Sequence, residues 1–227
     1  MKAFVIYLSG NEFSIQMMEE TVESLKKYNI EYELFDGVVG RAGIKVLDSF
    51  GVRPSAHVKQ NQWTDGTIGC LASHYLLWDK CAKQDKPFLI LEQDGVLIRD
   101  PREILPLVKG ACHLDAYLPF ESGDDEHYKT YEANLEKYEP GIKDHPKNSF
   151  YIGNEITGHS FRGAYGYLLT PKGAQGILNF IKNHGAFPAD KCLCSKATNI
   201  QRANSTYVRL NRFFKTLALQ RDFSLRK

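Results

Sequence analysis

The chain has 227 residues, a length suited to one domain, or to one domain with a long insert, and ample for a hydrophobic core. Hydrophobic residues make up 43% and charged residues 25%, ordinary values for a globular protein, and the net charge of +2 excludes a strong global field that would select a partner. No apolar run approaches the ~20 residues of a membrane span, and the N-terminus passes into a strand without a signal peptide, so we expect a cytoplasmic, soluble protein.

The cysteines are odd in number and form no metal-binding array. The Cys-Leu-Cys pair is too short for a zinc knuckle and has no partner pair. We therefore expect free thiols in a reducing compartment. The five residues are Cys70, Cys81, Cys112, Cys192 and Cys194.

The first 40 residues predict a strand, a helix and a second strand. Residues 3–8 form an apolar run that ends at Ser9-Gly10-Asn11, residues 13–28 have the apolar spacing of a helix, and residues 32–35 form a strand closed by Asp36-Gly37. This order is the first half of a nucleotide-binding α/β unit. The absence of a G-x-G-x-x-G or Walker loop argues against dinucleotide cofactors and P-loop chemistry.

Residues 41–66 lack sustained periodicity and are expected to be a long connection, either a cover for a ligand or a solvated loop. A helix with one buried face is predicted over 69–82, capped by Asp65 or Thr67.

Residues 88–91 form the clearest buried strand of the sequence. The apolar run stops at Glu92 and Asp94, which flank Gln93. Carboxylates at the carboxyl end of such a strand lie where open α/β sheets bind ligands, and two such acids can share a divalent cation. The alternative is that both acids only begin a turn at Gly95.

The second half of the chain predicts further elements and two charged regions. Residues 121–139 carry seven acidic residues, whereas 202–227 carry seven basic residues. We expect a helix at 102–108, a strand at 114–119, a charged excursion at about 121–150, a strand at 165–169, a helix at 172–182, and a basic C-terminal segment at about 199–227.

Four blocks in order resemble glycosyltransferase family 25, the lipooligosaccharide and collagen galactosyltransferases. Family members look like "F-D-A-V-x-G", "G-C-x-x-S-H", a strand ending in "E-D-D", and "G-x-x-A-Y" with a later "P-x-D". The corresponding residues here are 35–40, Gly69-Cys70 with Ser73-His74, Glu92-Gln93-Asp94, Gly163 to Tyr165 and Pro188 to Asp190. This sequence departs from the family in Gln93, where members have an acid.

The resemblance implies a fold and a donor site. The fold is α/β of the GT-A type, a single domain over 1–227 with a mixed, twisted central sheet flanked by helices. The implied ligand is a nucleotide sugar such as a UDP-hexose. Its implied binding residues are Ser9, Asn11, Asp36, Ser73, His74 and Glu92.

The resemblance also implies the chemistry. Mn²⁺ or Mg²⁺ would neutralise the leaving diphosphate, with Asp94 as first ligand and Glu92 beside it. The family is inverting, so one carboxylate serves as base for the acceptor hydroxyl. Asp190 is the best match, with Glu155 and Asp125 as reserves. A cation or imidazole completing the phosphate site would come from His159, Arg162 or His184.

The acceptor is left open. We expect a saccharide of lipooligosaccharide type. The aromatic residues interleaved with the basic segment make a hydroxylated base in DNA, as in bacteriophage DNA glycosylation, an alternative, and the same segment could contact an anionic membrane surface or be a solvated helix. A carbohydrate-binding relative that has lost its metal is a further hypothesis, because of Gln93.

Overall fold

The computed structural model describes residues 1–116, 125–146 and 154–211. Its helices are α1 (Glu12–Lys27), α2 (Ala42–Ser49), α3 (Asp65–Ala82), α4 (Asp125–Leu135), α5 (Asn154–Thr157), α6 (Pro171–His184) and α7 (Ala189–Cys192). Its strands are β1 (Lys2–Tyr7), β2 (Tyr32–Asp36), β3 (Phe88–Glu92), β4 (Gly95–Leu97), β5 (Ala111–His113), β6 (Ile142–Asp144), β7 (Gly166–Leu169), β8 (Ile200–Ala203) and β9 (Val208–Leu210). Single 3₁₀ turns lie at Gln60–Gln62, Pro101–Glu103 and Leu105–Leu107.

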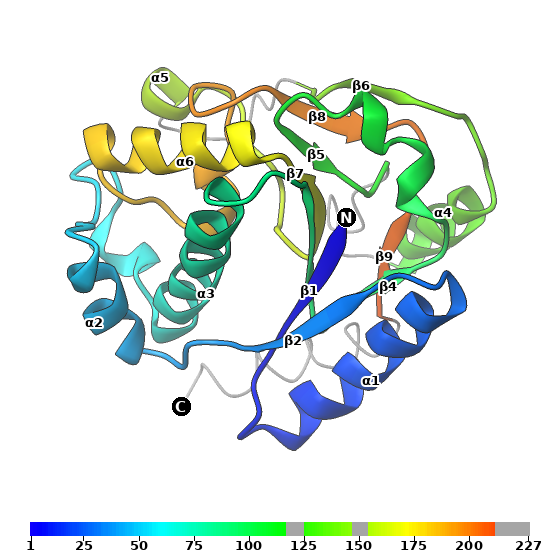
Figure 1. Cartoon of the computed structure of the whole chain (residues 1–227), viewed down its shortest axis with the longest axis horizontal. Helices are drawn as coiled ribbons and strands as arrows, with labels where there is room; N and C mark the ends of the chain where they lie inside the picture. The colour runs from blue at the N-terminus through cyan, green and yellow to red at the C-terminus, as the bar shows by residue number, and fades with distance from the viewer. Residues whose placement is uncertain (117–124, 147–153, 212–227) are drawn as a thin grey trace.

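A seven-stranded mixed sheet in the order β2-β1-β3-β7-β5-β8-β6 forms the centre (Figure 1). Strands β2, β1 and β3 are mutually parallel, β7 is antiparallel to both β3 and β5, and β5 is parallel to β8. The carboxyl ends of β1, β2, β3 and β5 therefore share one edge, where β7 begins. A separate ribbon pairs β4 with β9. The predicted α/β architecture with a mixed sheet flanked by helices is confirmed.

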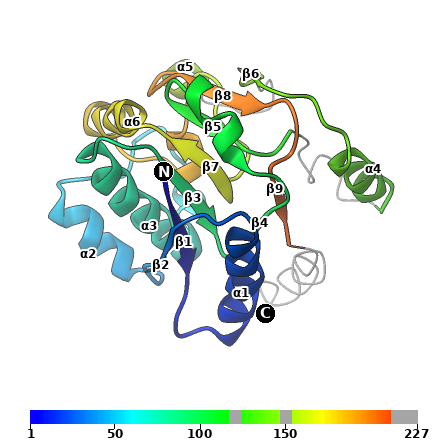
Figure 2. The ribbon, with the colours of Figure 1, turned by 45° about the vertical axis from the view of Figure 1, so that its right-hand side comes forward.

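Successive side chains of the central strands belong alternately to two hydrophobic clusters. Phe4 and Ile90 belong to the cluster shared with α3 and α6, whereas Val5 and Leu89 belong to the cluster shared with α1. This period of two follows from the pleat of a strand buried on both faces. Figure 2 shows α1 and α3 on opposite sides of β1 and β3.

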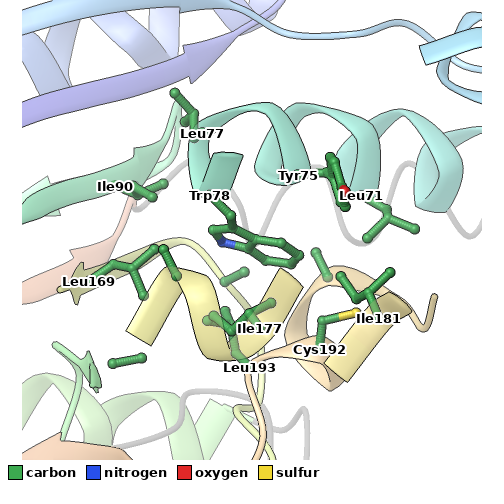
Figure 3. Close-up of a cluster of buried hydrophobic side chains, with 14 of the residues drawn as sticks. Leu71, Tyr75, Leu77, Trp78, Ile90, Leu169, Ile177, Ile181, Cys192 and Leu193 are labelled. Atoms are coloured by element: carbon green, nitrogen blue, oxygen red, sulfur yellow. The ribbon is translucent and has the colours of Figure 1, made fainter. Parts of the chain in front are cut away.

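The larger cluster is centred on Trp78, which has no exposed surface. Figure 3 shows its indole extending from α3 toward Ile177 of α6, with Leu193 below it. Burying an aromatic side chain of this size is one of the largest single contributions to a core, so α3 is fixed firmly against the sheet and α6.

Several predicted boundaries were wrong. The expected long connection over 41–66 contains α2, the helix expected to begin near Gly69 begins at Asp65 with Thr64 as its cap, and the helix expected at 102–108 is a pair of 3₁₀ turns. The strand expected at 114–119 lies earlier, at Ala111–His113, and 117–119 fall outside the described residues. The first part of the basic segment forms β8 and β9. The part beyond residue 211 lies outside the described residues.

Candidate active site

The predicted donor-binding residues at the ends of β1 and β2 are brought together. The carboxylate of Asp36 accepts hydrogen bonds from the backbone N–H of Ser9 at 3.0 Å and from its hydroxyl at 2.6 Å. The hydroxyl bond, followed by the backbone bond, lowers the pKa of Asp36 below its ordinary value. Asp36 is therefore a fixed, ionised and exposed acceptor at this edge.

Asn11 and Ser73 hold the backbone around this edge. The side-chain oxygen of Asn11 caps α1 by accepting from the N–H of Ser14 at 2.9 Å. The Ser73 hydroxyl donates to the Gly69 carbonyl and accepts from the N–H of Val38, each at 2.8 Å. Ser73 is 2% exposed, so its contribution to this site is to tie the segment after β2 to α3.

Gly69 explains how closely that segment approaches α3. A Cβ at this position would lie 2.4 Å from the carbonyl oxygen of Val38 and 2.9 Å from the backbone nitrogen of Gly40. Only glycine leaves room for this contact between helix and loop. Gly69 and Ser73, one turn apart, therefore seat the same loop.

His74 and Glu92 meet at the end of β3. His74 Nε2 lies 3.0 Å from Glu92 Oε1, and His74 Nδ1 lies 2.8 Å from the hydroxyl of Tyr167. That hydroxyl also accepts from the indole N–H of Trp78 at 2.8 Å. His74 is fully buried while the Glu92 side chain is 25% exposed, so this series of hydrogen bonds extends from the core to the edge of the site.

The Cys70 thiol lies beside the carboxylate of Glu92 and is affected by other acidic residues. Its thiol lies 3.7 Å from Glu92 Oε1. Burial, and then the nearby charges of Glu92, Asp190 and Asp94, hold the pKa of this thiol well above its ordinary value. Residues of β3, the following turn and α7, up to 98 positions apart in the sequence, are therefore near enough for their charges to act on this thiol.

The turn that carries Asp94 is fixed by Tyr165. The carbonyl oxygen of Tyr165 accepts from the N–H of Glu92 at 3.0 Å, and a Cβ at Gly95 would lie only 2.3 Å from this oxygen. The hydroxyl of Tyr165 donates to the buried carboxylate of Asp115 at 2.6 Å. Asp94 itself is 4% exposed, and its carbonyl accepts from the N–H of Asn211 at 2.7 Å.

Asp190 lies in the first turn of α7 and has a half-buried side chain. Its Oδ2 lies 3.1 Å from Lys191 Nζ and 3.5 Å from the backbone nitrogen of Gly163. Within the described part of the chain, no protein group is hydrogen-bonded to its other carboxylate oxygen.

The other candidates have different surroundings. The side chains of Glu155 and Asp125 lie outside the described residues. His184 is exposed at the end of α6 with its ring 4.9 Å from that of Phe180, and His159 stacks on His145 at 6.3 Å.

Sequence reasoning missed Cys70, Trp78 and Tyr167. Cys70 and His74 are one helical turn apart, and their ligand atoms lie within 4.8 Å of each other and of the Glu92 carboxylate. That spacing was a usable signal. Tyr167 lies 93 positions from His74 and is brought to it only by the β3–β7 pairing.

Comparison with known proteins places this chain among glycosyltransferases. Residues 1–193 match the profile of glycosyltransferase family 25, described as LPS biosynthesis protein. The lipooligosaccharide biosynthesis protein lic2B of Haemophilus influenzae is 30% identical over 95 residues, which are 42% of this chain and 34% of that protein. A second H. influenzae protein, named only as a glycosyltransferase, is 27% identical over 164 residues, 71% of this chain and 52% of the relative. The lipooligosaccharide biosynthesis protein lex-1 of the same species is 27% identical over 128 residues, which are 56% of this chain and 40% of that protein.

The chain thus spans between about a third and half of the length of these relatives. Among the helices in the described ranges, none combines the length and the apolar character required to cross a membrane.

Proposed function

This chain belongs to glycosyltransferase family 25, and on that premise we propose that it transfers a hexose from a UDP-sugar to a saccharide hydroxyl of lipooligosaccharide type. The observation that carries the proposal is the position of Glu92 at the carboxyl end of β3, with Asp94 in the turn that follows, at the sheet edge where Asp36 is also held at the end of β2. Names of two relatives, both lipooligosaccharide biosynthesis proteins, support the acceptor class.

The oxygen donors of Asp94 and Glu92 fit Mn²⁺ or Mg²⁺, because these cations prefer carboxylate ligands. The replacement of the family's middle acid by Gln93 leaves both flanking carboxylates in place; the Gln93 carbonyl accepts from the Thr21 hydroxyl at 2.8 Å, which fixes the backbone between them. A metal held there would neutralise charge on the departing diphosphate.

Asp190 is proposed as the base. Inversion requires a carboxylate on the acceptor side that takes the proton of the attacking hydroxyl. Lys191 and the Gly163 N–H contact one oxygen of Asp190, which orients the carboxylate. Asp36, with its lowered pKa, is proposed to accept from the nucleoside portion of the donor.

A donor panel with and without Mn²⁺ tests the proposal. We expect one UDP-sugar to raise the melting temperature only with metal, and Asp94→Asn to abolish that rise. We expect Asp190→Asn to keep donor binding but to lower transfer by roughly 10²–10⁴-fold, the usual contribution of a general base. The exposed Asp85, in the connection before β3, supplies a matched control, since Asp85→Asn should change neither.

The acceptor is tested with lipooligosaccharide lacking terminal sugars and, in parallel, with DNA containing hydroxymethylated bases. Transfer to DNA alone would overturn the saccharide acceptor and retain the enzyme class. Donor binding without metal dependence and without transfer to either would overturn the proposed reaction and favour a carbohydrate-binding protein.

A further inference from the structure

A continuous line of hydrogen bonds leads from the core to Glu92. The indole N–H of Trp78 lies 2.8 Å from the Tyr167 oxygen, that oxygen lies 2.8 Å from His74 Nδ1, and His74 Nε2 lies 3.0 Å from Glu92 Oε1. Trp78, Tyr167 and His74 all have 0% exposure, so the polar groups of these three residues are out of reach of bulk water.

The direction of every hydrogen bond in this line follows from one residue. An indole nitrogen can only donate, so the Tyr167 oxygen accepts from Trp78. The hydroxyl hydrogen of Tyr167 then requires an acceptor, and His74 Nδ1 is the one within hydrogen-bond distance among the described residues. Nδ1 must therefore be bare, which places the imidazole hydrogen on Nε2, where it donates to the Glu92 carboxylate.

The opposite arrangement violates two rules of buried polar groups. A hydrogen on Nδ1 would face the Tyr167 oxygen and leave the tyrosine hydrogen with no acceptor. In the neutral ring it would also place the Nε2 lone pair 3.0 Å from a carboxylate oxygen, two acceptors facing each other. The observed contacts satisfy all groups only with the Nε2–H tautomer.

We propose that Tyr167 and Trp78 are positioning residues, which act through the Nε2–H tautomer of His74 to bind Glu92 Oε1 and leave Oε2 available to a ligand. Cys70 Sγ, at 3.7 Å, is a second donor to the same oxygen. Within the described residues, Oε2 has no protein partner. That Oε2 serves the donor and its metal rests on the proposed function, whereas the tautomer does not.

The same atoms suggest a competing role. Cys70 Sγ, His74 Nε2 and Glu92 Oε1 lie within 4.8 Å of one another and resemble the ligands of a soft transition metal. A metal on Nε2 requires a lone pair there and a hydrogen on Nδ1. That arrangement leaves the hydroxyl hydrogen of Tyr167 without an acceptor. The direction of the hydrogen bonds therefore favours the positioning role.

The tautomer is measured directly by ¹⁵N NMR of protein labelled at histidine, with His74→Gln assigning the resonances. We expect a protonated Nε2 and a bare Nδ1 in the wild type. A wild-type ring protonated on Nδ1 would overturn the proposal without any variant or activity assay. A thiolate-to-cobalt band on titration with Co²⁺, lost in Cys70→Ser, would also overturn it in favour of a metal site.

The positioning effect is measured with Tyr167→Phe, which removes only the hydroxyl. Tyr75→Phe is the matched control, because Tyr75 lies in the same cluster and no hydrogen bond of its hydroxyl is seen in the described part of the structure. We expect Tyr167→Phe to broaden or shift the His74 Nδ1 resonance and to weaken Mn²⁺ binding in the presence of UDP, followed by electron paramagnetic resonance, by roughly 10–100-fold, as for other residues that orient a metal ligand. The control should change neither.

Failure of the two proposals gives different results. If no UDP-sugar is transferred and Mn²⁺ with UDP does not bind the wild type, the proposed function fails, while the NMR result still decides the tautomer. If the wild type binds and transfers but Tyr167→Phe, folded by circular dichroism, matches it in Mn²⁺ affinity and in KM for the donor, the positioning role is refuted.

Discussion

Acidification from pH 7 to pH 5 should destabilise the fold through two buried histidines. His113 and His145 are 0% and 2% exposed, with ring centroids 6.2 Å apart. Burial, with a smaller contribution from the charge of Arg202, lowers the pKa of His113 to about 4, and burial, followed by the neighbouring His113, lowers that of His145 to about 3. His113 Nδ1 lies 3.2 Å from the carbonyl oxygen of Asp115, and His145 Nδ1 lies 3.2 Å from that of Pro146.

The sign follows from proton uptake by the unfolded chain. An unfolded histidine has a pKa of 6.5, so between pH 6.5 and the folded pKa the unfolded state binds protons that the folded state does not. Stability therefore decreases as the pH is lowered through this range. At pH 5, 1.5 pH units below 6.5, each histidine contributes a loss of about 2 kcal/mol, at 1.36 kcal/mol per unit. The pair together removes about 4 kcal/mol, a large part of the 5–15 kcal/mol that holds a typical domain folded.

Urea unfolding at constant ionic strength between pH 7 and pH 5 measures this loss. We expect His113→Gln and His145→Gln each to remove about half of the pH dependence, and the double variant to remove most of it, although each lowers the stability at pH 7. His57→Gln is the control because His57 is exposed. An unchanged pH dependence in the double variant would refute the reasoning.

Three further substitutions test packing and capping by urea unfolding at pH 7. Gly69→Ala should cost about 1–3 kcal/mol because its Cβ would overlap the Val38 carbonyl, whereas Gly66→Ala in the same helix, with its nearest heavy atom 3.9 Å away, should be neutral or stabilising; equal effects would contradict the close approach. Asp115→Asn should cost about 1–3 kcal/mol, because the amide nitrogen that replaces one carboxylate oxygen cannot accept, so at least one of the three hydroxyl groups that now donate to this carboxylate loses its acceptor; a stability equal to wild type would exclude that role. Thr170→Ala should cost about 1 kcal/mol, since its side chain accepts from the N–H of Gly173 at the start of α6, and Thr170→Ser should restore it.

The elements predictable from sequence are those whose pattern is set by their own residues. The runs that became β1, β3 and β7 are buried throughout or nearly so, and the apolar spacing of α1 and α6 marks one face. Such patterns need no knowledge of the neighbouring element.

The elements that sequence reasoning missed depend on partners elsewhere in the chain. In α2, Gly43 weakens the helical pattern, yet its Cβ would lie 2.8 Å from the Ile68 carbonyl, so the glycine is required by packing on α3. Strand β8 carries the polar residues Gln201 and Arg202, and it is a strand because β5 and β6 pair with it. The predicted strand at 114–119 was misplaced because the buried polar residue Asp115 was read as part of the strand, whereas its burial depends on hydroxyl groups from α4, from Tyr165 just before β7, and from the β8–β9 connection.

The residues of the candidate site also differ in whether a local pattern or a distant partner places them. Asp36, Glu92 and Asp94 could be predicted to lie near one edge because strand ends are visible in the sequence, and parallel strands place those ends together. The Tyr167 hydroxyl was not found, because its contact with His74 depends on the register that pairs β7 with β3, which no local pattern reveals.

Helix α3 explains why these strand ends keep a fixed geometry. Two of its residues one turn apart, Gly69 and Ser73, seat the loop after β2, and a second pair one turn apart, Cys70 and His74, binds Glu92 at the end of β3. The two pairs are offset by one residue, or about 100° around the helix, so they face neighbouring directions. Trp78, one turn beyond His74, anchors the same helix in the core and donates to the hydroxyl that orients His74. The residues of the G-C-x-x-S-H motif therefore contact both the segment that follows Asp36 and the carboxylate of Glu92. Because they belong to one helix, they fix the distance between these two parts of the site.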